Sequence, residues 1–237
     1  MTALRIVMLT TFYPPHSFGG DAVGVQRLAR ALVRRGHEVT VIHDADSFQT
    51  LGGNLPDAKV EPDDPKIISL KSRFGFGSNL LTQQFGQPVV HRRRIAAELE
   101  RGDYDIIWYN NTSLVGGPGL LSLGRGLKVY EAHEHWLVCP MHVLWRHNRE
   151  LCDKRDCFRC TLSFRRPPQL WRYTSMLERR AREVDLFIAK SEFSKNKHAE
   201  FGFKPPMEVV PYFLPDIPAS DESAARERPY FLFVGRL

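Results

Sequence analysis

Four cysteines lie close together in one segment of the chain, and their thiols could bind a metal ion. They follow the spacing C-x12-C-x4-C-x2-C, at Cys139, Cys152, Cys157 and Cys160. Four thiolates suit tetrahedral Zn²⁺, and such an ion could fold a segment that is too polar to form its own core. His142 and His147 could act as substitute ligands. The spacing therefore predicts a structural zinc site.

Other interpretations of the same cysteines stay open. The last three match the C-x4-C-x2-C spacing of plant-type iron–sulfur ferredoxins, although the fourth cysteine would then lie upstream instead of downstream. Free thiols are a further alternative, and so are two disulfides if the compartment is oxidising. Under each interpretation we expect the role of the cysteines to be structural, not catalytic.

A glycine pair, Gly19-Gly20, precedes a segment with helical periodicity. The N-terminus of a helix presents free backbone N–H groups and the positive end of the helix dipole, which favour an anion such as a phosphate or a carboxylate. The alternative is that the two glycines only make the turn. The pair is not the G-x-G-x-x-G dinucleotide fingerprint, and the carboxylate of Asp21 would repel a phosphate.

His133 follows the apolar run 127–131, at the end of a strand in the expected sheet. Ligands of parallel α/β sheets bind at the carboxyl ends of the strands. A neutral or weakly charged imidazole there can donate to a hydroxyl group of a ligand or to charge developing in a transition state, and the adjacent Glu134 could orient it. The alternative is a strand-end histidine bonded to neighbouring backbone.

Basic residues form three clusters: Arg92-Arg93-Arg94, Arg165-Arg166, and Arg179-Arg180 with Arg182. Most such runs are solvated helix faces. With the nearby aromatic residues Phe164, Trp171 and Tyr173, the later clusters could instead contact an anionic membrane surface. Nucleic acid is not expected as a partner, because the chain contains no recognised DNA- or RNA-binding module.

The elements that must position these residues alternate between strands and helices. The runs 4–9, 39–42, 104–109, 127–131, 184–189 and 207–210 indicate short buried strands. Residues 25–33 carry an apolar stripe of helical spacing, and Gly36 stands where a left-handed C-cap is expected. The pattern predicts an α/β fold: a Rossmann-like, doubly wound, mostly parallel sheet. Residues 44–87 are less regular, and Phe74–Asn79 is expected to be an exposed loop.

Composition excludes several other classes of protein. The chain has 237 residues, of which 43% are hydrophobic and 25% charged, and these values are ordinary for globular proteins. No apolar run approaches the roughly 18 residues that a membrane span requires, and no signal-peptide layout is present. We therefore expect a cytoplasmic protein with reduced thiols. The net charge of +6 is compatible with anionic partners but selects none of them.

We expect residues 1–215 to form one domain, with a cysteine-containing insertion at about 139–168. A polar linker is expected at 216–229, and residues 230–237 resemble the first strand of a further domain that is absent here.

Motifs in a fixed order along the chain resemble the N-terminal half of family 4 glycosyltransferases, which have the two-domain GT-B fold. They are Phe12-Tyr13-Pro14-Pro15, Gly19-Gly20, Leu28-Ala29-x-x-Leu32, 35–41, 130–134, Ala189-Lys190-Ser191-x-Phe193, 209–212 and 231–237. At Ala22 the chain departs from the pattern, because many members have an acidic residue there.

The resemblance implies a retaining glycosyltransferase that moves a sugar from a nucleotide-diphosphate sugar to a glycan or lipid-linked acceptor. It implies that Gly19 and Gly20 lie near the donor phosphates and the acceptor, that His133 contacts the donor sugar, and that Gly235 and Arg236 bind the diphosphate. No catalytic metal is expected. Polysaccharide or glycolipid biosynthesis follows from family habit, with the protein cytoplasmic or peripheral at the inner face of the membrane. The alternative is a non-catalytic, Rossmann-like anion-binding module or a partner subunit of a split transferase.

Overall fold

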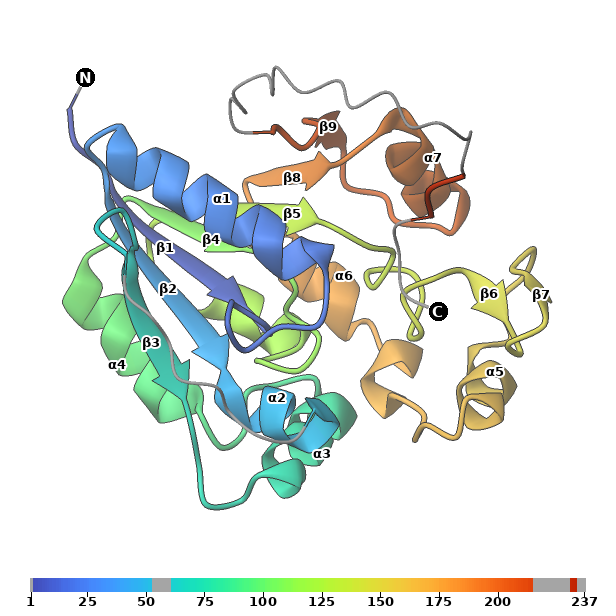
Figure 1. The fold of residues 1–237 in the computed structure, drawn as a ribbon. Coiled ribbons are helices and arrows are strands. Elements are labelled where there is room, and N and C mark those ends of the chain that lie inside the picture. Colours follow the sequence, from blue (N-terminus) through green and yellow to red (C-terminus); the bar gives the residue numbers. More distant parts are fainter. Residues whose placement is uncertain (1, 53–60, 215–230, 234–237) are drawn as a thin grey trace.

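A seven-stranded parallel sheet forms the centre of the molecule (Figure 1). The computed structural model describes residues 2–52, 61–214 and 231–233. The strand order is β3-β2-β1-β4-β5-β8-β9, and every neighbouring pair is parallel. The strands are β1 (Arg5–Thr10), β2 (Glu38–Asp44), β3 (Lys66–Leu70), β4 (Ile106–Tyr109), β5 (Leu127–Ala132), β8 (Leu186–Ala189) and β9 (Met207–Val209). The predicted Rossmann-like, doubly wound sheet is confirmed.

The order of the strands reverses at β1. The chain runs outward through β2 and β3 on one side of β1 and continues through β4, β5, β8 and β9 on the other. In register, Leu9 of β1 lies beside Ile42 of β2 and Tyr109 of β4. Loops leave the sheet in opposite directions at such a point, which opens a crevice beyond the carboxyl ends of the strands.

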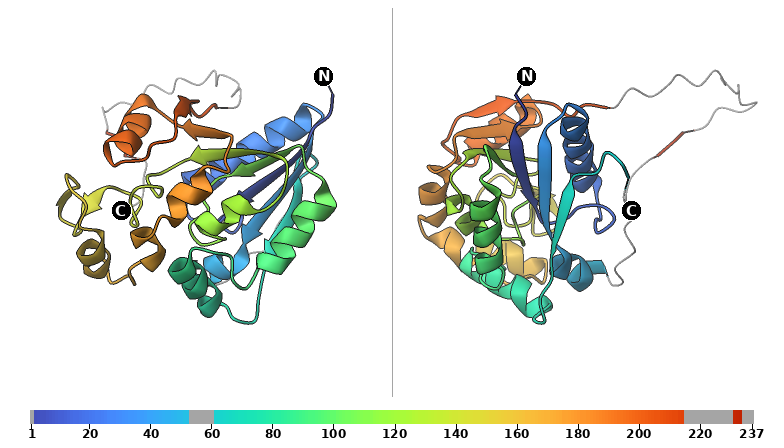
Figure 2. Two further views of the ribbon diagram at one scale, coloured as in Figure 1. Left: turned by 180° about the vertical axis from the view of Figure 1, so that it is seen from behind. Right: turned by 90° about the vertical axis from the view of Figure 1, so that its left-hand side faces the viewer.

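Helices cover both faces of the sheet. Seen edge-on, the strands lie between α1 on one side and α4 on the other (Figure 2, right). The helices are α1 (Gly20–Arg34), α2 (Ala45–Gly52), α3 (Phe76–Phe85), α4 (Arg92–Gly102), α5 (Cys157–Ser163), α6 (Met176–Ala181) and α7 (Glu192–Glu200), with 3-10 turns η1 (Pro118–Ser122) and η2 (Leu170–Tyr173).

Each face of the sheet has its own hydrophobic core, because successive side chains of a strand point to opposite faces. Ile6 and Met8 of β1 belong to the cluster that includes Val25 of α1. Val7 and Leu9 belong to the larger cluster, which contains Ile95 of α4. This burial on both faces explains why β1 reads as an unbroken apolar run. The expected C-cap of α1 is confirmed, since Gly36 has φ +85°.

The less regular segment 44–87 contains three elements, and the expectation of a loop at Phe74–Asn79 was wrong in part. Residues 45–52 form α2, 66–70 form the edge strand β3, and α3 begins at Phe76 inside the expected loop Phe74–Asn79. Polar residues of α3 are buried because they have hydrogen-bond partners in α2. Asn79 Oδ1 accepts from Ser47 Oγ at 3.0 Å, and Asn79 Nδ2 donates to Thr50 Oγ1 at 3.1 Å. Buried polar groups with such partners leave no apolar periodicity in the sequence.

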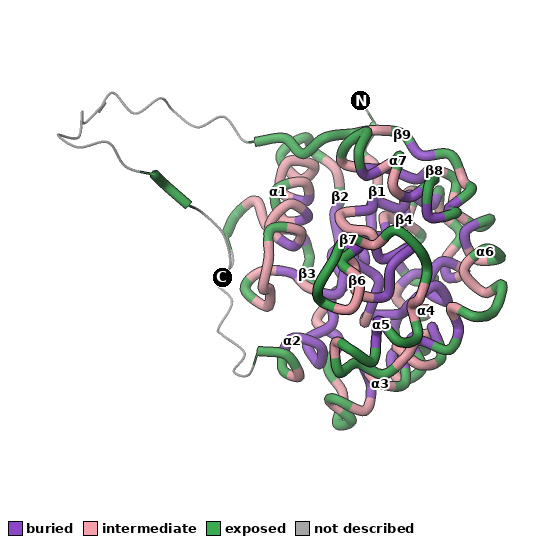
Figure 3. The backbone as a smooth tube through the Cα atoms, turned by 90° about the vertical axis from the view of Figure 1, so that its right-hand side faces the viewer, coloured by how far each residue is buried: buried purple, intermediate pink, exposed green. Residues whose placement is uncertain are grey.

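The insertion at about 139–168 leaves the sheet after β5. It contains a short antiparallel hairpin of β6 (Trp145–Arg146) and β7 (Glu150–Leu151), followed by α5. The hairpin is largely exposed in front of the buried strands (Figure 3). The expected linker at 216–229 lies outside the described residues, as do Tyr230 and residues 234–237 of the expected final strand. Residues 231–233 are exposed and form no regular secondary structure.

Candidate functional site

A cavity of about 620 Å³ lies beyond the carboxyl ends of β4, β5 and β8. The beginning of α1 forms one wall and residues 210–213, which follow β9, form another. Trp108, Glu131 and Lys190 reach it from the three strand ends. This is the side of the sheet at which ligands of doubly wound folds bind, so the topology and the cavity point to the same place.

The glycine pair stands where the sequence predicts, at the N-terminus of α1. Gly19 precedes the helix in an extended conformation without a capping side chain, and Gly20 begins the helix and lines the cavity. A Cβ added at Gly20 would meet no heavy atom within 4 Å, so packing does not require glycine there. Asp21 lines the same cavity, and its Oδ2 accepts from Asn111 Nδ2 at 3.2 Å. The role of the pair in anion binding stays a prediction.

His133 follows β5, and its imidazole is only 2% exposed. Nε2 lies 3.0 Å from Asn110 Oδ1, and Nδ1 lies 2.5 Å from the hydroxyl of Tyr212. The amide of Asn110 is oriented by Nδ2, which donates to the carbonyl oxygen of Trp108. Because Asn110 Oδ1 can only accept, Nε2 carries the proton and Nδ1 accepts from Tyr212. Tyr212, which lines the cavity, therefore covers Nδ1 of His133, and His133 itself is not among the lining residues.

Burial lowers the pKa of His133, and the cation of Lys190 lowers it further against the opposing effect of Glu131. The ordinary value is about 6.5, so the imidazole is neutral at pH 7. The neutral form agrees with the hydrogen bonds, which need one ring nitrogen as donor and the other as acceptor. The predicted orientation by Glu134 was wrong: Glu134 Oε2 pairs with His142 Nδ1 at 2.6 Å, and Asn110 orients the ring instead.

Beside His133, a buried carboxylate is compensated by a cation and by an indole. Glu131 forms an ion pair with Lys190 through Oε1, and Trp108 Nε1 donates to Oε2 at 2.8 Å. Lys190 Nζ also lies 4.6 Å from the centre of the Tyr212 ring. Such pairing is what allows a carboxylate to stay charged away from water.

Sequence reasoning gave no role to Trp108, Glu131, Lys190 or Tyr212, although three of them stand in the motifs quoted above. Their common signal is position: Trp108 and Glu131 lie near the ends of strands, and Lys190 directly follows one. Gly24 was also missed. A Cβ there would lie 2.7 Å from Cε1 of Tyr212, so glycine leaves the space in which the phenol ring packs on α1.

The four cysteines lie together, away from this cavity. All of them line a small, partly open space of about 20 Å³, and none forms a disulfide. Metal binding by these cysteines stays a prediction. The alternative ligands are engaged elsewhere, since His142 pairs with Glu134 and His147 Nε2 lies 3.3 Å from Asp156 Oδ2.

A buried acidic cluster at the end of β2 was not anticipated. Ligand atoms of Asp44, Asp46 and His91 lie within 4.8 Å of one another. Protein hydrogen bonds account for the carboxylates: Asp44 accepts from Ser47, and Asp46 accepts from His91 and Ser72. Desolvation raises the pKa of Asp44 to about 6. The cluster ties α2 to the loops after β3 and before α4.

The predicted basic clusters are solvent-accessible. Arg92, Arg93 and Arg94 are exposed in the first turn of α4, and Arg165, Arg166, Arg179 and Arg182 are exposed near the insertion and α6. Within the described residues, no helix has the length and apolar character needed to cross a membrane. Gly235 and Arg236, the predicted diphosphate contacts, lie outside the described residues.

Comparison with known proteins identifies a family for this chain. Residues 18–214 match the model of Glycosyltransferase Family 4. An uncharacterized 42.6 kDa protein in the cps region of Klebsiella pneumoniae is 25% identical over 216 residues, covering 84% of this chain and 52% of that protein. An uncharacterized glycosyltransferase of Methanocaldococcus jannaschii is 42% identical over 53 residues, 21% of this chain and 14% of that protein.

Among solved structures, CalG4, the calicheamicin glycosyltransferase, matches with a TM-score of 0.37 and 17% identity, covering 92% of this chain and 56% of that one. The chain spans about half the length of the Klebsiella protein.

Proposed function

The chain belongs to Glycosyltransferase Family 4, and from this premise we propose that it is the acceptor-side domain of a retaining glycosyltransferase. The proposed donor is a nucleotide-diphosphate sugar, and the proposed acceptor is a glycan or a lipid-linked sugar in polysaccharide or glycolipid biosynthesis. The observation that carries the proposal is the cavity at the carboxyl ends of the strands, lined by the start of α1 and by paired charges.

The groups around the cavity have the chemistry that sugars and phosphates require. Asp21 and Glu131 offer carboxylate oxygens to hydroxyl groups, and Arg27 and Lys190 offer cationic donors. The first turn of α1 adds backbone N–H groups beside Gly20. Mixed charges of this kind favour a polyhydroxylated ligand that also carries a phosphate.

His133 is the proposed contact to the donor sugar. The proton on Nε2 is held by Asn110, so Nδ1 is the nitrogen available to a ligand once Tyr212 swings away. In this tautomer the imidazole accepts a hydrogen bond from a sugar hydroxyl and remains uncharged. Gly235 and Arg236 are the proposed diphosphate ligands, and the proposed reaction requires no catalytic metal.

A transfer assay on the protein that contains this chain tests the proposal. Release of nucleoside diphosphate is measured for UDP-, GDP-, ADP- and dTDP-sugars in the presence of EDTA. We expect one donor class to react and His133→Gln to lower kcat/KM by about 10²-fold or more, as loss of an oriented polar group at a reacting centre does. The anomeric configuration of the product, read by NMR, should be that of the donor.

The matched control is His147→Gln, which changes a histidine of the insertion that pairs with Asp156. Equal activity of wild type and His133→Gln contradicts the proposed role of His133. Binding of a nucleotide without any transfer would favour the alternative of a non-catalytic module or a partner subunit.

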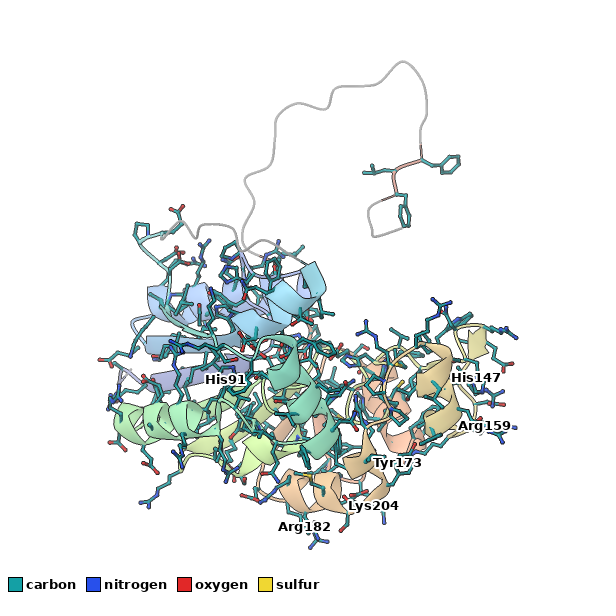
Figure 4. All side chains as sticks on the ribbon, turned by 90° about the horizontal axis from the view of Figure 1, so that it is seen from below. His91, His147, Arg159, Tyr173, Arg182 and Lys204 are labelled. Carbon is teal, nitrogen blue, oxygen red and sulfur yellow. The ribbon has the colours of Figure 1, made fainter. Side chains whose placement is uncertain are left out.

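We also propose peripheral contact with an anionic membrane surface. The support is a second cavity, of about 660 Å³, that combines apolar and basic side chains, including Tyr173, Arg182 and Lys204. Figure 4 shows these three side chains along one rim of the molecule. Apolar surface rimmed by cations is the combination that binds anionic lipid head groups.

Co-sedimentation with phosphatidylcholine vesicles, with or without phosphatidylglycerol, tests this contact. We expect binding only with the anionic lipid, and its loss in the double variant Arg182→Glu, Lys204→Glu. Arg92→Glu with Arg93→Glu, on α4, is the matched charge control. Equal binding to vesicles with and without phosphatidylglycerol contradicts the proposal.

A further inference from the structure

The four cysteines reach one place from three parts of the insertion. Cys139 ends the loop after β5, Cys152 directly follows β7, and Cys157 and Cys160 lie in α5. The space that they line, of about 20 Å³, is large enough for a single water molecule or a small ion. All four thiols are free.

The backbone of the insertion contacts one of these sulfurs and contains several residues in the left-handed conformation. The backbone N–H of His147 donates to Cys160 Sγ at 3.3 Å, and the N–H of Cys152 donates to the carbonyl oxygen of Leu144 at 2.8 Å. His142, Leu144, His147 and Asn148 have φ values between +50° and +73°. Non-glycine residues rarely adopt this left-handed region, and each costs about 1 kcal/mol or more unless the surroundings hold it there.

The insertion has little hydrophobic core with which to hold that backbone. Its two strands contain two residues each. The exposed fractions of Leu151, Phe158 and Leu162 are 75%, 48% and 51%. Segments with so little buried apolar surface usually depend on a cross-link or a bound metal. No disulfide is present to supply the cross-link.

A positive charge lies next to this space: Arg172 and Cys157 both line the neighbouring cavity of about 660 Å³. The guanidinium of Arg172 lies 4.5 Å from the ring centre of Trp171 and donates to Gln169 Oε1 and to the carbonyl oxygen of Trp136. Within the described part of the chain it forms no ion pair with a carboxylate. Buried charges are normally paired, so thiolates are the natural counter-charge of Arg172.

We propose that Cys139, Cys152, Cys157 and Cys160 bind one structural Zn²⁺ and that Arg172 offsets part of its charge. When four thiols bind one Zn²⁺ they release four protons to water, which leaves a complex of net charge −2 beside the guanidinium. Zinc–sulfur bonds of about 2.3 Å place the sulfurs about 3.8 Å apart. No three of the four sulfur atoms lie within 4.8 Å of one another. Cys152 and Cys157, which are partly exposed, must therefore turn inward to bind the ion.

The metal would also fix the loop that carries His133. Cys139 follows His133 by six positions, and its N–H donates to the carbonyl oxygen of His135 at 2.7 Å. The N–H of His135 in turn donates to the carbonyl oxygen of His142. A zinc ion on Cys139 therefore anchors the turn that follows His133.

A measurement of the metal content tests the proposal directly. The full chain, purified without chelators, is analysed by mass spectrometry for zinc and iron and by thiol titration. We expect one zinc per chain and thiols that react only after a chelator is added. Cys152→Ser and Cys157→Ser should lose the zinc, whereas His142→Gln, His147→Gln and Asp46→Asn should keep it. Arg172→Gln should weaken zinc binding about 10–100-fold, as changes next to a metal's ligands do.

Cysteine variants that fail to fold do not prevent the test. Refolding the chain with Co²⁺ should give the intense charge-transfer absorption of a tetrahedral cobalt–thiolate site, which free thiols and disulfides lack. Zinc far below one per chain together with four reactive thiols overturns the proposal, as do two disulfides by mass or stoichiometric iron with sulfide. Loss of zinc in Asp46→Asn, but not in the cysteine variants, would assign the metal to the acidic cluster instead.

Discussion

Replacing Tyr212 with phenylalanine removes one hydroxyl from the cover of His133 and leaves the ring in place. The phenol donates to Nδ1 of an imidazole that is almost fully buried, at 2.5 Å. The contact between the ring and Lys190 Nζ, at 4.6 Å, survives the change. The variant therefore isolates a single hydrogen bond between neutral partners, for which about 1 kcal/mol is expected.

A double-mutant cycle with His133→Phe measures that bond. His133→Phe also leaves Asn110 Oδ1 without its donor, but this cost occurs in both halves of the cycle and cancels. We expect urea unfolding to give a coupling of about 1 kcal/mol. In Tyr212→Phe, the pKa of His133 should rise, because the neutral ring loses the donor that stabilises its unprotonated nitrogen. A coupling free energy within error of zero, together with an unchanged NMR titration of His133, would refute the hydrogen bond and show that Tyr212 does not shield the imidazole.

Two further predictions follow from the same geometry and from the buried core. Gly24→Ala should displace the phenol ring and raise the solvent exposure of His133, because the added Cβ would lie 2.7 Å from the ring, whereas Gly20→Ala meets nothing within 4 Å and should leave it unchanged. Hydrogen exchange or NMR titration of His133 distinguishes the two variants. An equal exposure of His133 in both would contradict the packing of Tyr212 on Gly24. Burial, with a smaller contribution from His16, lowers the pKa of His43 to about 4. The unfolded value is about 6.5, so the unfolded chain binds more protons between these limits, and stability should fall by up to about 3 kcal/mol as the pH drops from 6.5 to 4. His43→Gln should remove that part of the pH dependence in urea titrations, and an unaltered slope would show that His43 is not its source.

Much of the fold could be predicted from local patterns. The apolar runs of β1, β2, β4, β5 and β8 are strong because these strands are covered by layers on both faces. The edge strand β3 was missed, since its first residues are exposed and only its last is buried. The start of α3 was missed because buried Ser78 and Asn79 replace an apolar stripe with hydrogen bonds.

The candidate site was likewise predictable only in part from the sequence. By itself, the sequence determined that a glycine pair opens α1, that a histidine follows β5, and that four cysteines share one insertion, because each of these depends on residues near one another in the chain. Only the tertiary structure decided that Glu131 meets Lys190 and that Tyr212 covers His133 across 79 positions. Parallel strands bring their carboxyl ends to one edge whatever their separation in sequence. Which side chains then touch depends on strand order and register, and long-range packing alone sets both.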